Sequence, residues 1–189
     1  MIAIDVAILP PPEVATRAIE LSATLPRNES LGLLLGGDVL PHITLTQQFV
    51  PAERLDDALD RIGTMLTSVA ALPLTVTGPG RSTAIWMSIE LTPALTDLHC
   101  RLMDTLAPFE RPDGTVDAFF GGIARDGDVA WVSGFRRTSS YAAFTPHITL
   151  GHAARLPAVE RMTFEATTIA ACHLGKFCTC RHVLRQWKL

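Results

Sequence analysis

The sequence predicts an α+β fold with antiparallel sheets, and three observations lead to this class. Short apolar runs typical of strands are mixed with amphipathic stretches whose apolar residues have a helical period. The two kinds of segment do not alternate strictly, and two of the runs are joined by a glycine-containing turn at residues 78–80, as in a hairpin. One pentapeptide also occurs in each half of the chain, which indicates a duplicated structural unit.

The first half of the chain predicts two strands and two helices. The run at residues 2–9 is branched and apolar apart from one aspartate, and it ends at a proline cluster, as a buried strand would. A helix is predicted at residues 12–25, because this segment opens at a proline and carries an apolar stripe. A second strand is predicted at residues 39–49, and an amphipathic helix follows at residues 52–69.

The second half predicts more strands than helices. A hairpin precedes an amphipathic helix that opens at Thr92-Pro93. Residues 114–127 are rich in glycine and have no clear periodicity. Strands are predicted at residues 72–77, 84–91, 129–135, 146–151, 164–173 and 177–187, and the helix at residues 93–106.

Size and composition predict a single domain that covers residues 1–189. The chain is 48% hydrophobic and 19% charged, which is ordinary for a globular protein of 189 residues. No apolar run reaches the ~18 residues of a membrane span, and the first residues lack the basic segment of an export signal. Four unevenly spaced cysteines are too few for a disulfide scaffold. We therefore expect a soluble, cytoplasmic monomer with reduced thiols and no membrane partner.

The charge of the chain limits its partners. The formal net charge is -3, and non-specific affinity for nucleic acid comes from many Lys and Arg side chains on phosphates. Long duplex nucleic acid is therefore excluded as the expected partner. A small phosphorylated ligand or one end of an RNA is still compatible with this charge.

The most informative feature is the repeated pentapeptide Pro-His-Ile-Thr-Leu, which spans residues 41–45 and again residues 146–150. An identical pair of pentapeptides arises by chance in about one sequence in a hundred of this length. Neighbouring residues of a strand face opposite sides, so histidine and threonine share one face and isoleucine and leucine the other. Each copy thus presents an imidazole and a hydroxyl on one face and anchors itself through two apolar side chains.

Two such strands that face each other across a pseudo-two-fold axis would place two histidines and two threonines around one cleft. This set suits phosphodiester chemistry. A neutral imidazole can accept a proton from water or a ribose hydroxyl, while an imidazolium protonates the leaving oxygen. The ordinary histidine pKa of about 6.5 makes both forms accessible near neutral pH. Threonine hydroxyls can donate to the phosphate oxygens, and no metal or cofactor is needed.

The two His-x-Thr motifs, separated by more than half of the chain, resemble those of the two-histidine phosphoesterase superfamily. This superfamily includes the bacterial 2′-5′ RNA ligase-like proteins and cyclic nucleotide phosphodiesterases. The resemblance implies a bilobal, pseudo-two-fold fold with antiparallel sheets around a central cleft and helices outside. It also implies metal-independent hydrolysis or ligation at a 2′,3′-cyclic phosphate or a 2′-linked phosphodiester of a nucleotide or RNA end. The catalytic residues implied are His42, Thr44, His147 and Thr149.

Other residues are candidates for holding the rest of such a substrate. Aromatic side chains can stack on a base, and a cation can bind a second phosphate. His152 follows the second motif where many RNA ligase-like relatives have a basic residue, so hydrolysis and ligation both remain open. The candidate substrate-binding residues are Tyr141, His152, Phe49, Trp86 and Arg81.

Two alternative functions follow from the same sequence. A protein of this fold could bind a nucleotide or RNA end in its cleft without turnover. A zinc-dependent hydrolase could instead use Cys178, Cys180 and His182, which would alternate onto one face of a strand. The cysteines lack the close spacing of a structural zinc knuckle, so reduced cysteines packed in a C-terminal hairpin are expected and no metal is predicted.

Overall fold

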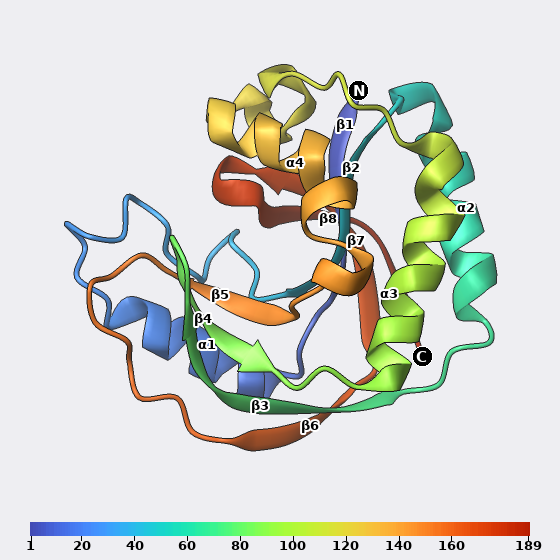
Figure 1. Ribbon diagram of the computed structural model, residues 1–189. Coiled ribbons are helices and arrows are strands. Elements are labelled where there is room, and N and C mark those ends of the chain that lie inside the picture. The colour runs from blue at the N-terminus through green and yellow to red at the C-terminus, as the bar shows by residue number, and fades with distance from the viewer.

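The computed structural model describes all residues from 1 to 189 and confirms an α+β fold with two antiparallel sheets (Figure 1). One sheet has the order β2-β1-β7-β8 and the other the order β5-β4-β3-β6. The strands of the first sheet are β1 (Ile2–Ile8), β2 (Ile43–Val50), β7 (Thr168–Gly175) and β8 (Thr179–Lys188). Those of the second sheet are β3 (Leu72–Arg81), β4 (Ile85–Ile89), β5 (His147–Gly151) and β6 (Met162–Ala166).

Four α-helices surround these sheets, and α2 and α3 lie side by side (Figure 1). Two helices pack against the motif strand of the other half of the chain: α1, which follows β1, contacts β5, and α3, which follows β4, contacts β2. None of the four combines the length and apolarity needed to cross a bilayer. Their bounds are α1 (Pro12–Ala23), α2 (Leu55–Leu66), α3 (Pro93–Leu106) and α4 (Asp126–Thr138).

Three sequence-based assignments are wrong. Residues 78–80 were expected to form the turn of a hairpin but belong to β3 and pair with β4, so the turn follows Arg81. Residues 129–135 were expected to be a strand but form the middle of α4, where Val132 and Phe135 are buried at helical spacing. The side chain of Asp128 accepts a hydrogen bond from the backbone N–H of Arg125 and caps the start of this helix. Residues 164–173 do not form one strand, because β6 pairs with β3 while β7 pairs with β1 in the other sheet.

Both copies of the pentapeptide contain a β-bulge at their last residue. In the first copy Thr44 and Thr46 pair with successive residues of β1, so Leu45 has no partner in the ladder. The register shifts at the same place in the second copy, which leaves Leu150 unpaired against β4. Each bulge frees a backbone carbonyl that must find a hydrogen bond elsewhere, because both leucines are fully buried.

Side chains from α1 and α3, the helices that pack against the opposite motif strand, provide those hydrogen bonds. The hydroxyl of Ser22 on α1 donates to the carbonyl of Leu150 at 2.7 Å and accepts from the N–H of Leu35 at 3.0 Å. Nδ1 of His99 on α3 donates to the carbonyl of Leu45 at 2.6 Å. Burial lowers the pKa of His99, so the ring is neutral and its Nε2 accepts from the N–H of Tyr141. Each half of the protein thus fixes the motif strand of the other.

Replacing Ser22 with alanine is expected to lower the free energy of unfolding by about 1–3 kcal/mol, because the buried N–H of Leu35 and carbonyl of Leu150 lose their partner. Urea unfolding measures the change. Thr64→Ala is the matched control, since Thr64 is exposed and bonds only to its own helix, and it should stay within about 0.5 kcal/mol. A loss for Ser22→Ala no larger than for Thr64→Ala would contradict the cross-half role of this hydroxyl.

Candidate active site

A cleft of about 590 Å³ lies where the motif strands β2 and β5 approach each other. All four motif side chains that the sequence singles out line it: His42, Thr44, His147 and Thr149. The alternate residues of each motif face the core, where Ile43, Leu45, Ile148 and Leu150 are fully buried. The alternation predicted from the pentapeptide therefore holds in both copies, and the duplicated strands bring two imidazoles and two hydroxyls to one cavity.

The two histidine rings are oriented by the same local hydrogen bond. Nδ1 of His42 donates to the carbonyl of Leu40 at 2.8 Å, and Nδ1 of His147 donates to the carbonyl of Thr145 at 2.7 Å. In each case the acceptor is two residues earlier in the chain. Because Nδ1 carries a proton in both rings, Nε2 is the atom that can accept or release a proton.

The strands beside the two motifs carry different residues. Each motif strand pairs with a neighbour, β2 with β1 and β5 with β4, and the two pairings can be compared position by position. Asp5 on β1 then corresponds to Ala84, and Ala7 corresponds to Trp86 on β4. His42 therefore has a carboxylate as its neighbour, with Oδ2 of Asp5 at 3.6 Å from its Nε2. This distance is too long for a hydrogen bond, so the Nε2 of His42 is not committed to Asp5.

His147 has an indole as its neighbour instead. The rings of Trp86 and His147 lie with their centroids 4.7 Å apart, and the indole N–H of Trp86 donates to Ser88 at 3.1 Å. A Cβ on Gly80 would come within 2.1 Å of the indole nitrogen, so only glycine at this position leaves room for the ring. Burial lowers the pKa of His147, and the backbone hydrogen bond to Thr145 opposes this only in part. The neutral imidazole is therefore the favoured form of His147.

Asp5 is fully buried and organises the first motif. Its Oδ2 accepts hydrogen bonds from the hydroxyl of Thr44 and the amide of Gln47, both at 2.7 Å, while its Oδ1 has no partner. Burial raises the pKa of Asp5, and the attraction of His42 and these two hydrogen bonds lower it less. Sequence reasoning did not select Asp5, although a single acidic residue in an apolar strand was a signal of a polar role.

A second residue that the sequence analysis missed is Trp131. Its indole N–H donates to the side-chain oxygen of Gln47 at 2.9 Å, so the polar chain from Asp5 continues to the rim of the cleft. Trp131 lines the cleft and is 48% exposed, which leaves part of its ring open to solvent. The sequence analysis expected a strand at residues 129–135, but these residues belong to the helix α4, which packs against β2. Trp131 therefore could not be predicted to face β2.

The far end of the cleft carries its only Lys or Arg side chain, Arg125. The guanidinium bonds to Asp128 at 2.5 Å and lies over the ring of Phe177, with its carbon 3.9 Å from the ring centre. His152 also lies here, 5.8 Å from Phe177 between ring centres, and its Nδ1 donates to the carbonyl of Thr83. This end therefore combines a paired cation with aromatic surface.

The structure brings two of the five substrate-binding candidates into the cleft, namely His152 and Trp86. Phe49 must be removed from the set, because its ring is fully buried against Phe119. Tyr141 does not line the cleft, and its hydroxyl is bound to Asp104 and Arg136. Arg81 is also outside, where its guanidinium donates to the carbonyls of Ala153 and Ala154.

The C-terminal cysteines do not form the face that the zinc alternative required. Cys178 lies in a turn before β8 and lines the cleft, Cys180 is buried, and His182 is exposed. All four cysteines are free thiols, and burial raises the pKa of Cys178 and of Cys180 well above the ordinary value. Cys178 and His182 therefore do not share a metal site with Cys180.

Comparison with known proteins decides the family. The family model described as the 2′-5′ RNA ligase superfamily matches residues 10–173, which is most of the chain. The chain belongs to the 2′-5′ RNA ligase superfamily. No curated protein sequence matches it significantly. The resemblance recognised from the two His-x-Thr motifs is confirmed by this match.

Several solved structures share the fold of this chain. A phosphoesterase crystal structure is 19% identical, with a TM-score of 0.64 over 100% of this chain and 99% of that one. The protein TT0787 of Thermus thermophilus is 18% identical, with a TM-score of 0.68 over 100% and 98%. LigT of E. coli, in complex with 3′-AMP, is 21% identical, with a TM-score of 0.64 over 98% and 97%.

The buried carboxyl of Asp5 makes a pH-dependent contribution to stability. Its pKa is higher in the folded protein than in the unfolded chain, so stability is lost as the pH rises from the unfolded pKa through the folded one. Asparagine cannot ionise and avoids this loss. The free energy of unfolding of Asp5→Asn relative to the parent is therefore expected to increase from pH 4 to pH 8.

Urea unfolding at the two pH values measures this difference. Asp113→Asn is the control, because Asp113 is exposed and its substitution should change stability by less than about 0.5 kcal/mol at both pH values. A relative stability of Asp5→Asn that is constant or falls between pH 4 and pH 8 would show that Asp5 is not penalised by burial.

Proposed function

We propose that this member of the 2′-5′ RNA ligase superfamily is a metal-independent phosphoesterase that opens a cyclic, 2′,3′-type phosphodiester or cleaves a 2′-linked one. Its substrate is a nucleotide or an RNA end. The observation that carries the proposal is the pair of imidazoles in one cleft, each with Nδ1 bound to a backbone carbonyl and Nε2 available. Two such groups can perform both proton transfers of phosphodiester hydrolysis.

The unequal surroundings of the histidines support a division of their roles. The half-buried, neutral His147 is suited to accept a proton from water as the water oxygen bonds to phosphorus. His42 then gives its Nε2 proton to the ribose oxygen as the bond from that oxygen to phosphorus breaks. A carboxylate 3.6 Å from Nε2 stabilises the positive charge that His42 carries before this step.

The threonines also differ in what they can offer to a phosphate. The hydroxyl of Thr44 donates to Asp5, whereas that of Thr149 has no hydrogen-bond partner within the protein. Thr149 is therefore the freer donor to a non-bridging oxygen, where a hydrogen bond stabilises the developing charge. Thr44 can serve the phosphate only if its hydroxyl turns away from Asp5.

The rim of the cleft supports a nucleoside as part of the substrate. Trp131 presents an indole whose N–H is fixed by Gln47, and a ring held in this way can stack on a base without further ordering. LigT has been crystallised with 3′-AMP and with ATP, and it shares this fold. A base on Trp131 would leave the attached phosphate free to lie between the two motifs.

Each histidine is expected to be essential for turnover. His42→Ala and His147→Ala should each lower kcat by about two to four orders of magnitude on a nucleoside 2′,3′-cyclic phosphate, because each removes one proton transfer. The assay uses chelator-treated protein and separates 2′- from 3′-phosphate products. His182→Ala is the matched control, since His182 is exposed on β8, and it should keep parental activity.

Near-parental activity in either motif variant would overturn the proposed mechanism. Activity that disappears when the parent is treated with a chelator would show that a metal performs the reaction. Binding of the nucleotide by the parent without any product would favour a nucleotide or RNA-end binding module of the same fold.

The assignment of His147 as base predicts the acidic limb of the pH profile. Burial holds the pKa of His147 below its ordinary 6.5, so kcat/KM should fall with a midpoint below pH 6.5 as the imidazole becomes protonated. Trp86→Ala removes the ring that stacks on His147 and should move this midpoint upward. A midpoint above pH 7 in the parent, or no shift in Trp86→Ala, would contradict the assignment.

A further inference from the structure

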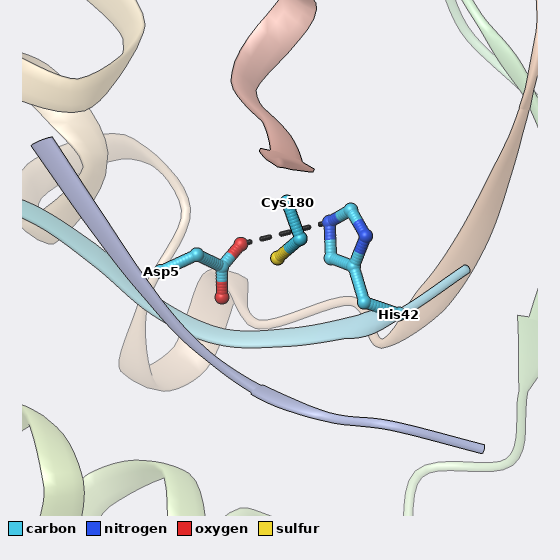
Figure 2. Close-up of side chains that lie close together, drawn as sticks. All are labelled: Asp5, His42 and Cys180. Carbon is cyan, nitrogen blue, oxygen red and sulfur yellow. Dashed lines mark ion pairs between the residues drawn. The ribbon is translucent and has the colours of Figure 1, made fainter. Parts of the chain in front are cut away.

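Three potential metal ligands meet behind the first motif. The carboxylate of Asp5, the imidazole of His42 and the thiol of Cys180 point toward one another, with the sulfur beside the carboxylate and the ring (Figure 2). One donor atom from each lies within 4.8 Å of the other two, and Oδ2 of Asp5 and Nε2 of His42 are 3.6 Å apart. The ligands of a tetrahedral zinc ion at 2.0–2.3 Å are separated by roughly 3.3–3.8 Å, so small adjustments bring these donors to bonding distance.

The surroundings of the cluster match the outer shell of a metal site. Histidines that bind a metal usually donate their other ring N–H to a backbone carbonyl, as Nδ1 of His42 does to Leu40. Ligating carboxylates are themselves hydrogen-bonded, as Oδ2 of Asp5 is by Thr44 and Gln47. These contacts fix Nε2 as the free nitrogen and orient the carboxylate toward the cluster.

The cluster also contains a buried acceptor that nothing in the protein satisfies. Oδ1 of Asp5 has no hydrogen-bond partner, although the residue is fully buried. An unpaired carboxylate oxygen in the interior is energetically costly, and a cation bound beside it removes that cost. His42 belongs both to the cluster and to the lining of the cleft, so the cluster adjoins the cleft at this ring.

We propose that Asp5, His42 and Cys180 form a binding site for Zn²⁺ or another thiophilic divalent cation, and that occupation of the site inhibits the enzyme. Nitrogen, carboxylate oxygen and thiolate are the ligands that zinc prefers, and water in the cleft supplies the fourth. Binding converts the thiol of Cys180 to a thiolate and releases its proton to solvent. The ion takes the lone pair of the His42 Nε2, so that nitrogen can no longer hold the proton needed for the reaction.

This site differs from the zinc hydrolase considered from the sequence. The ligands come from β1, from the residue just before β2 and from β8, and only Cys180 belongs to the C-terminal hairpin. The metal blocks a proton carrier and takes no part in turnover. The metal-binding part of the proposal is independent of the proposed function, whereas the inhibition rests on it.

Cobalt binding tests the site without any enzyme assay. The chelator-stripped parent is titrated with Co²⁺, and one equivalent is expected to produce the thiolate-to-cobalt charge-transfer absorption of a site with a cysteine ligand. The absorption should be lost when Zn²⁺ is added. Cys180→Ala should lose the band and bind Zn²⁺ at least about tenfold more weakly, since even outer-shell substitutions cost 10–100-fold in metal affinity.

Cys172→Ala is the matched control for this experiment. Cys172 is fully buried beside Cys180 in the same small core cluster but contributes no ligand to the site. It should keep the cobalt band and the parental affinity for Zn²⁺. If Cys180→Ala fails to fold, Cys180→Ser, which preserves the size of the side chain, takes its place in the same titration.

The enzymatic consequence is measured separately on a nucleoside 2′,3′-cyclic phosphate. Zn²⁺ should inhibit the parent and Cys172→Ala at the concentrations that fill the site, and at least about tenfold more should be required for Cys180→Ala. Absence of the cobalt band in the parent, or an undiminished band in Cys180→Ala, overturns the metal site. A normal band in a parent that hydrolyses no substrate confirms the metal site while the proposed function fails.

Discussion

The arrangement of the cleft depends on two buried backbone carbonyls that have no hydrogen-bond partner within their own sheets. The bulges at Leu45 and Leu150 each expose a buried carbonyl, and a side chain on the helix of the opposite half, His99 or Ser22, satisfies it. A buried carbonyl without a partner is costly, so these hydrogen bonds fix how far each motif strand lies from the other half. The positions of the two motif faces are therefore a property of the whole chain.

The same pentapeptide acquires two chemical characters from its neighbours. A carboxylate lies beside His42, whereas an indole covers His147, because equivalent positions of β1 and β4 carry different residues. Duplication alone would give two histidines in identical surroundings, whereas the proposed division of roles uses the difference between them. The difference between the halves thus comes from strands that contain no part of the motif.

The sequence predicts the motif strands well and their surroundings less well. Alternation along the pentapeptide correctly places His42 and His147 on the cleft, because a strand has a fixed period of two. Trp131 was missed because its β-branched neighbours suggested a strand, while the cap at Asp128 and burial at helical spacing determine a helix. The cluster of Asp5, His42 and Cys180 joins three residues that lie far apart in the sequence, and no spacing in the sequence reports such a contact.

The crossing of α1 and α3 between the halves has an evolutionary consequence. If one half of the chain existed alone, its helix would lie on the wrong side to satisfy its own bulge carbonyl. Two separate copies that kept these contacts would exchange helices, as in a domain-swapped dimer with two-fold symmetry. Fusion of the copies makes that exchange intramolecular and removes its dependence on concentration. In the fused chain one copy carries an aspartate and the other a tryptophan beside the motif histidine.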